Sequence, residues 1–68
     1  MSDFKITLKA ARVNAGLTIK DAAKSIGIAA STLISWEKHP EKINALYQSK
    51  ISEVYKISTD NIIFLSKN

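Results

Sequence analysis

The chain has 68 residues, of which 46% are hydrophobic and 24% are charged, with no cysteine and a single histidine. This length leaves no room for a second domain, and the missing cysteines and lone histidine exclude disulfides and a structural zinc as supports for the fold. Ten Lys and Arg against six Asp and Glu give a formal net charge of +4, which favours a polyanionic partner.

The N-terminal sequence MSDFKITLK lacks the apolar run of a signal peptide, and the longest apolar runs in the chain reach only four residues. Such runs are far too short to span a membrane. Together with the absence of cysteine, they predict a soluble protein located in the cytoplasm. No membrane partner is expected.

Apolar residues recur at spacings of three and four along most of the chain, so the sequence predicts an all-α fold. A first helix is expected over about 7–14, ending before Gly16, which can take a positive φ without steric cost. Thr18 can cap a second helix, and Asp21 three residues later suits its positive end. The apolar stripe of this second helix consists of Ile19, Ala22, Ala23 and Ile26.

Gly27 is expected at a tight turn, followed by a third helix over about 30–38. Leu33 and Trp36, three residues apart, should face the core. In helix-turn-helix proteins the second helix of the pair places its N-terminal side chains against the DNA bases. Here that position holds a short polar face made of Ser31, Thr32 and Ser35. The alternative is that these Ser and Thr residues only cap the helix.

A polar connection follows the third helix. Pro40 should keep that helix from continuing, and Asn44 can cap a fourth helix over about 45–56. His39 is the single histidine of the chain and lies in this polar connection, so we interpret it as a loop residue and not as a catalytic or metal-binding one.

The last predicted element is a short fifth helix over 60–65, capped by Ser58 or Thr59. It holds the apolar run Ile62, Ile63, Phe64 and Leu65. This run either covers the core or contacts another subunit.

The order and spacing of these signals resemble the phage-repressor and Cro-like (XRE-type) helix-turn-helix family. The resemblance spans 8–65 and is carried by Arg12, Gly16, Leu17, Thr18, Ala23, Gly27, Ile28, the STL of 31–33 and the WE of 36–37. It implies a lambda-repressor-like domain, a compact bundle of five short helices. This single domain would occupy residues 1–68, with the helix-turn-helix at about 18–38.

The resemblance also implies roles for individual residues. Arg12 and Glu37 should form an ion pair that ties the first helix to the end of the third, and contact between Arg12 and DNA is the alternative. The positions that face base edges would be Ala30, Ser31, Thr32 and Ser35. The positions that meet phosphates would be Thr18, Lys20, Lys38, Lys42 and Asn44, with Lys24 as a further candidate.

Several residues depart from the pattern of this family. Ile19 stands where a glutamine usually grips phosphate, and Ala29 stands where a serine or threonine usually caps the recognition helix. Ala30 and Ser35 stand where long polar side chains often read bases. The recognition face is therefore short and uncharged. It can form hydroxyl hydrogen bonds and a methyl contact with thymine, but no bidentate Arg–guanine contact.

The sequence thus predicts a sequence-specific transcriptional regulator of phage or prophage repressor type that binds double-stranded DNA. A single short helix reads only a few base pairs, so a homodimer on a two-fold site is expected. Its contact would use the fifth helix, through Ile62, Ile63, Phe64 and Leu65, and the loop before the fourth helix. The alternative is a protein-interaction module that docks a partner through the same four residues.

The sequence also bears on other classes of function. It holds no nucleophile–base pair, metal-ligand cluster or phosphate-binding loop. We therefore expect no enzyme activity and no catalytic residue, cofactor, metal or small-molecule substrate.

Overall fold

The computed structural model describes residues 4–65. Its elements, in chain order, are the helices and 3-10 turns α1 (Leu8–Asn14), α2 (Ile19–Ile26), α3 (Ala30–Lys38), η1 (Pro40–Lys42), α4 (Ala45–Tyr55) and η2 (Thr59–Asn61). Within residues 4–65 the only β-type pairing is an isolated bridge between Ile6 and Ile62. The all-α fold expected from the sequence is confirmed.

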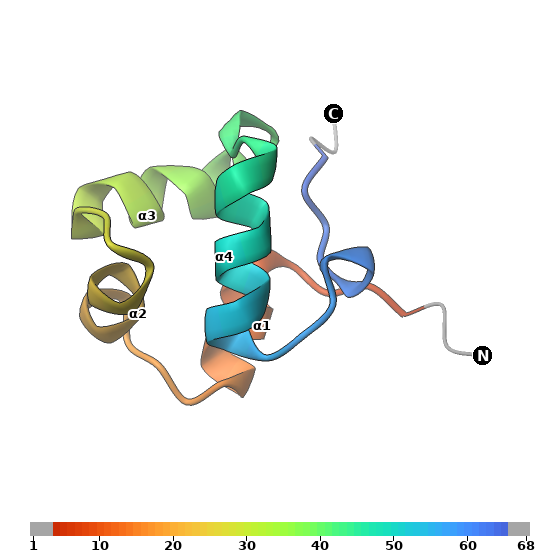
Figure 1. Cartoon of the computed structure of the whole chain (residues 1–68), viewed down its shortest axis with the longest axis horizontal. Coiled ribbons are helices and arrows are strands. Elements are labelled where there is room, and N and C mark those ends of the chain that lie inside the picture. Colours follow the sequence, from red (N-terminus) through yellow and green to blue (C-terminus); the bar gives the residue numbers. More distant parts are fainter. Residues whose placement is uncertain (1–3, 66–68) are drawn as a thin grey trace.

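The helices are arranged around α4, which stands at the centre of Figure 1. α2 packs against both α3 and α4, and α1 and η2 pack against α4 from other sides. α3 and the chain that leads through η1 into α4 lie together at the top of the view, while η2 lies to the right of α4, on the side away from α2 (Figure 1). This arrangement presents α3 and the start of α4 on one surface.

Three helices begin at polar residues whose side-chain oxygens accept hydrogen bonds from free backbone N–H groups, as the sequence indicates. Thr7 accepts from the N–H of Ala10, Thr18 from that of Asp21, and Asn44 from that of Tyr47, at 3.1, 3.0 and 3.0 Å. α3 differs, because it begins after Ala29, which has no side-chain oxygen to offer. Local capping chemistry therefore sets the start of α1, α2 and α4 but not that of α3.

The turn between α2 and α3 is made by Gly27, which ends α2 in the left-handed conformation at φ 92° and ψ 34°. The carbonyl of Ala23 accepts hydrogen bonds from the N–H groups of both Gly27 and Ile28, at 2.8 and 2.9 Å. This pattern closes the last turn of α2 and redirects the chain at once. Glycine suits this position because other residues rarely adopt so large a positive φ.

The core lies between α1, α2, α3 and α4. Its largest fully buried side chains are Leu8, Ile26, Leu33 and Ile51. Ala22 and Ala23 are buried as well, and their small side chains let α2 approach α3 and α4 closely. Trp36, expected to face inward, packs at the edge of the core.

The chain after α4 differs from its predicted form. In place of a helix over 60–65, the single 3-10 turn η2 is capped by Ser58, and residues 62–64 are extended. The Ile6 N–H donates to the carbonyl of Asn61 at 2.9 Å, and the Ile63 N–H donates to the carbonyl of Ile6 at 2.8 Å. The prediction of a fifth α-helix was wrong because these backbone groups pair with Ile6, which lies 55 to 57 residues away along the chain. A short isolated helix rich in β-branched residues is too unstable to compete with this pairing.

This pairing also corrects one predicted contact. Ile62 is only 3% exposed and belongs to the core, so its side chain is not available to a second subunit. Ile63 and Phe64 are half-buried, and Leu65 is 77% exposed. Among the described residues, the helices are all too short and too polar to cross a membrane.

Candidate nucleic-acid interface

The first turn of α3 is open to solvent. Ala30 and Ser31 are exposed, and Thr32 and Ser35 lie half-buried beside them. In residues 4–65 the hydroxyl groups of these three Ser and Thr residues have no hydrogen-bond partner, and no side chain caps the helix. They therefore do not act as caps, which was the alternative interpretation of their position. Their hydroxyls are available to an external partner.

The orientation of α3 is fixed by an ion pair at its opposite end. The Nε of Arg12 donates to Oε2 of Glu37 at 2.6 Å, and its Nη2 lies 3.5 Å from Oε1. The Nη1 of the same guanidinium donates to the carbonyl of Leu17 at 2.9 Å. Arg12 thus links α1, the loop before α2 and the last turn of α3 through one planar group.

Both members of this pair are shielded from water. The side chains of Arg12 and Glu37 are 10% and 11% exposed, and Arg12 counts among the buried residues. A guanidinium that is 10% exposed and held by three hydrogen bonds within the chain has little surface left for a further partner. This favours the structural role of Arg12 over the alternative role of contacting DNA.

A second set of contacts holds the same end of α3. The rings of Trp36 in α3 and Tyr47 in α4 lie with centroids 5.3 Å apart and planes inclined at 57°, a tilted aromatic pair. Leu33, one turn earlier in α3, is completely buried. The helix is therefore anchored by its middle and its C-terminal turn.

Tyr55 lies close enough to the ion pair to feel its charges, a role that the sequence did not indicate. The residue is buried, and its hydroxyl has no hydrogen-bond partner within residues 4–65. Burial raises the pKa of Tyr55 to about 12; the charge of Glu37 also raises it, whereas the charge of Arg12 lowers it. The phenol is therefore neutral at ordinary pH.

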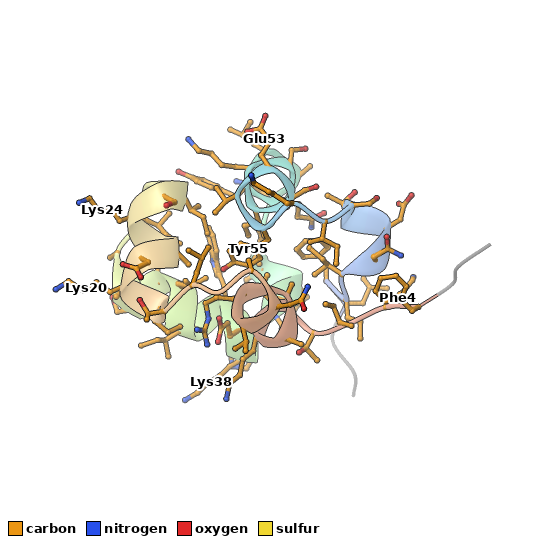
Figure 2. The ribbon with its side chains drawn as sticks, turned by 90° about the horizontal axis from the view of Figure 1, so that it is seen from below. Phe4, Lys20, Lys24, Lys38, Glu53 and Tyr55 are labelled. Carbon is orange, nitrogen blue, oxygen red and sulfur yellow. The ribbon has the colours of Figure 1, made fainter. Side chains whose placement is uncertain are left out.

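The cations assigned to phosphate contact are all exposed but point in different directions. Figure 2 shows Lys20 and Lys24 projecting together from α2 on one side of the molecule, while Lys38 projects from a different side and Glu53 points away from Lys38. Lys42 is exposed in η1. The structure thus groups Lys20 with Lys24 and separates both from Lys38.

Thr18 and Asn44 serve as helix caps. Their side-chain oxygens accept backbone hydrogen bonds within the chain. Both residues are exposed, and each still has a polar hydrogen, on the Thr18 hydroxyl and on the Asn44 amide, that can be donated outward. Capping and phosphate contact are compatible at both positions.

Two features near this surface have no counterpart among the predicted site residues. Glu41 lies in η1 beside Lys42, and its carboxylate is 3.6 Å from Nδ1 of His39, so the loop after α3 carries a negative charge as well as positive ones. Ile34 is an exposed apolar residue in the middle of α3. Helical spacing from Ala30 to Ile34 could have indicated that both lie on one side of the helix.

A groove of about 190 Å³ lies beside the C-terminal end of α3. It is lined by Thr7, Leu8, Glu37, Lys38, Pro40, Ile63 and Leu65. Three separate segments therefore meet here, and the last of them contributes Ile63 and Leu65, two of the four residues expected to contact another subunit. Among the described residues there is no group of three or more metal-binding side chains.

A protein-family model described as Helix-turn-helix matches residues 8–62. The matched segment begins with α1 and ends just after η2, so it contains all four helices and every residue assigned above to base or phosphate contact. No curated protein and no solved structure matches the chain.

Proposed function

Because the chain belongs to the XRE-type helix-turn-helix family of DNA-binding regulators, we propose that it is a sequence-specific transcriptional regulator of phage or prophage repressor type. In this proposal α3 enters the major groove and the protein binds as a dimer. It acts in the cytoplasm, where its DNA is found. The family is one of regulators and is not an enzyme class.

The observation that carries the proposal is the contrast along α3 between an anchored end and an open one. Ser31 and Ser35 project unpaired hydroxyls from a helix whose position is set by the pair Arg12–Glu37. An α-helix with side chains is about 10–12 Å across and the major groove is about 12 Å wide, so one exposed helix fits. Base contact is assigned to Ala30, Ser31, Thr32 and Ser35.

Phosphate contact would then come from both sides of the groove. Thr18 and Lys20, at the start of α2, would contact phosphates of one DNA strand. Phosphates of the other strand would be contacted by Lys38, Lys42 and Asn44. The separate directions of Lys20 and Lys38 suit this division. Such contacts position α3 without reading sequence.

A dimer follows from the small size of the reading surface. Two half-sites one helical turn apart are about 34 Å from centre to centre. The longest dimension of the molecule is 33 Å, so two copies on such a site are close enough to touch. A two-fold contact uses the same surface on both copies.

The surface we assign to that contact is the groove beside Lys38, with Ile63 and Leu65 in its lining. The half-buried Phe64 lies between these two residues in the sequence. Leu65 is the most exposed large apolar residue of this region, and the groove offers apolar walls of matching character. Because the groove adjoins the end of α3, contact here would also fix the distance between two reading helices.

The rival proposal is that these same residues dock a different protein and that the chain no longer binds DNA. The uncharged reading surface and the acidic Glu41 in the adjoining loop favour it. The net charge of +4 and the unpaired hydroxyls of α3 argue against it.

Selection of bound sites from random double-stranded oligonucleotides tests the main proposal, followed by titration at several salt concentrations. We expect one enriched two-fold motif. If three lysines of each copy neutralise phosphates, the logarithm of affinity should fall against the logarithm of salt with a slope of about −5. No enriched motif together with a flat salt response would overturn the proposal and favour the rival.

Sedimentation of the free protein and of its DNA complex tests the dimer separately. Leu65→Asp should prevent two copies from binding one site cooperatively, while single half-site binding persists. Leu46→Asp, on an equally exposed residue of α4 outside the groove lining, is the matched control and should leave cooperativity intact. Unchanged cooperativity in Leu65→Asp would show that the two copies contact each other through a different surface.

A further inference from the structure

Ile34 stands out on α3 because it is a large apolar side chain turned to solvent. Its side chain is 46% exposed. It lies four residues after Ala30 and four before Lys38, so the three share one side of the helix, and all three are exposed. This stripe, Ala30–Ile34–Lys38, runs along the flank of the hydroxyl surface formed by Ser31 and Ser35.

The fold gives no reason for an isoleucine at this position. Ile34 belongs neither to the buried core nor to the partly buried hydrophobic residues packed against it. Isoleucine is also a weaker helix former than alanine, glutamine or lysine, any of which would suit an exposed helical position better. Single exposed apolar residues are common on protein surfaces, so its significance comes from where it lies.

The stripe connects two kinds of DNA contact. At one end Ala30 lies in the turn assigned to base edges, and at the other end Lys38 is assigned to a phosphate. The apolar group that the major groove offers is the 5-methyl of thymine, which projects from the side of the base edge nearest its own sugar–phosphate strand. A side chain midway between a base contact and a phosphate contact meets that part of the groove.

We propose that Ile34 is a specificity-determining residue that recognises the methyl group of a thymine, with Ala30 extending the same apolar contact. This inference rests on the proposed function, because it requires α3 to enter the major groove. It assigns a fixed A·T pair in each half-site to the flank of the helix. The bases opposite Ser31 and Ser35 are read by hydrogen bonds.

The side chain suits this task. The branched Cβ of isoleucine restricts χ1, so little rotamer freedom is lost when the side chain becomes fixed against a base. The contact is apolar and does not discriminate by hydrogen bonding. It therefore depends on one methyl group of the DNA, which can be removed chemically without altering base pairing.

The experiment begins with the motif obtained by selection. Each thymine is replaced in turn by deoxyuridine, which lacks only the 5-methyl, symmetrically in both half-sites. Affinity is then measured for the unaltered protein, for Ile34→Ala and for Val13→Ala. Val13 is an exposed β-branched residue of α1, and its substitution is the matched control.

At one thymine of the half-site we expect deoxyuridine to weaken binding by the unaltered protein about fourfold for each half-site, from the loss of one buried methyl. Ile34→Ala should bind more weakly and show no further loss at that thymine. Val13→Ala should respond as the unaltered protein does. Ile34→Val, which keeps a branched Cβ, should retain part of the effect.

The result that overturns the inference is a motif whose thymines all tolerate deoxyuridine, or a loss of affinity that is the same with and without the Ile34 side chain. In either case the proposed function stands, since the motif itself has been selected. Failure to select any motif overturns the proposed function and this inference together. Thermal unfolding of Ile34→Ala, expected to match that of the unaltered protein, excludes a folding defect as the cause.

Discussion

The two ends of α3 differ in how far they are buried and in how many contacts hold them. The C-terminal half is buried and fixed, with Glu37 paired to Arg12 and Trp36 tilted against Tyr47. The N-terminal turn is exposed, begins at an alanine and carries hydroxyls with no partner among residues 4–65. The residues that aim the helix are therefore distinct from those assigned to read DNA, and substitutions at the two ends should separate stability from recognition.

The largest effect is expected at the fixed end. Arg12→Ala leaves the carboxylate of Glu37 without its partner in a site that is 11% exposed, and should lower the free energy of unfolding by about 3 kcal/mol. That is a large share of the stability of a small domain, roughly 5 kcal/mol. Urea unfolding followed by circular dichroism measures it. An unchanged midpoint would show that the pair does not stabilise the fold.

A double variant sharpens this test. Arg12→Met with Glu37→Leu removes both charges and should be less destabilised than Arg12→Ala alone, since neither group is then buried without a partner. Lys9→Ala, on an exposed residue of the same helix, is the control and should change unfolding by no more than about 0.5 kcal/mol.

The next effect is expected at Gly27, in the turn that leads from α2 to the open end of α3. Gly27→Ala meets no atom within 4 Å, so its cost is the backbone conformation at φ 92°, about 1–2 kcal/mol. Gly27→Asn should cost less because asparagine tolerates the left-handed region. Equal unfolding midpoints for both variants and the unaltered protein would contradict a strained turn.

A smaller effect of opposite sign is expected at Tyr55. Tyr55→Phe removes a buried hydroxyl that has no hydrogen-bond partner among residues 4–65, and should raise the free energy of unfolding near pH 7 by about 1 kcal/mol. The pKa of Tyr55 is raised from 10.0 to about 12, so the folded state holds the phenolic proton more tightly than the unfolded state. The stability that the folded state gains from keeping this phenol protonated is complete below pH 10, and it is lost as the pH rises from about 10 to 12.

The free energy of unfolding should therefore be measured for Tyr55→Phe and for the unaltered protein across that pH range. We expect Tyr55→Phe to be the more stable, by a margin that grows as the pH rises. Tyr47→Phe, on the half-buried tyrosine of the same helix, is the comparison for alkaline effects common to both proteins. Parallel curves for Tyr55→Phe and the unaltered protein would show that ionisation of Tyr55 is not linked to folding.

The smallest effect on stability is expected at the open end. Ser31→Ala with Ser35→Ala removes hydroxyls that have no partner within residues 4–65, so the free energy of unfolding should change by less than about 0.5 kcal/mol. Discrimination between the selected motif and altered sites should nevertheless fall by roughly thirtyfold for each half-site, as expected for two hydrogen bonds of about 1 kcal/mol each. Unchanged site preference would remove these serines from the reading surface.

The parts of the fold that depend on nearby residues were predictable from the sequence. Thr18, Asn44 and Gly27 each act on backbone groups within four residues, and the helix boundaries around them follow the sequence signals closely. The Arg12–Glu37 contact spans 25 residues, and only the resemblance to a known family suggested it.

Other features of the fold depend on contacts between distant parts of the chain, which the spacing of residues in the sequence does not reveal. The apolar run at 62–65 was expected to be helical, and the backbone of Ile6 instead draws it into an extended form. Burial of the Tyr55 hydroxyl beside the ion pair results from the packing of α4 against α1. The roles of Ser31, Thr32 and Ser35 at the bases stay predictions until the motif is known.

The bridge between Ile6 and Ile62 has a consequence for synthesis of the protein. Residue 6 leaves the ribosome long before residue 62. The segment around Ile6 therefore stays without its pairing segment until α1 to α4 have all left the ribosome. Ile62 is also a core residue. We expect purified chains ending at residue 58 to be digested by protease faster than chains that include Ile62. The protein would then be unable to hold DNA firmly until residue 62 has left the ribosome.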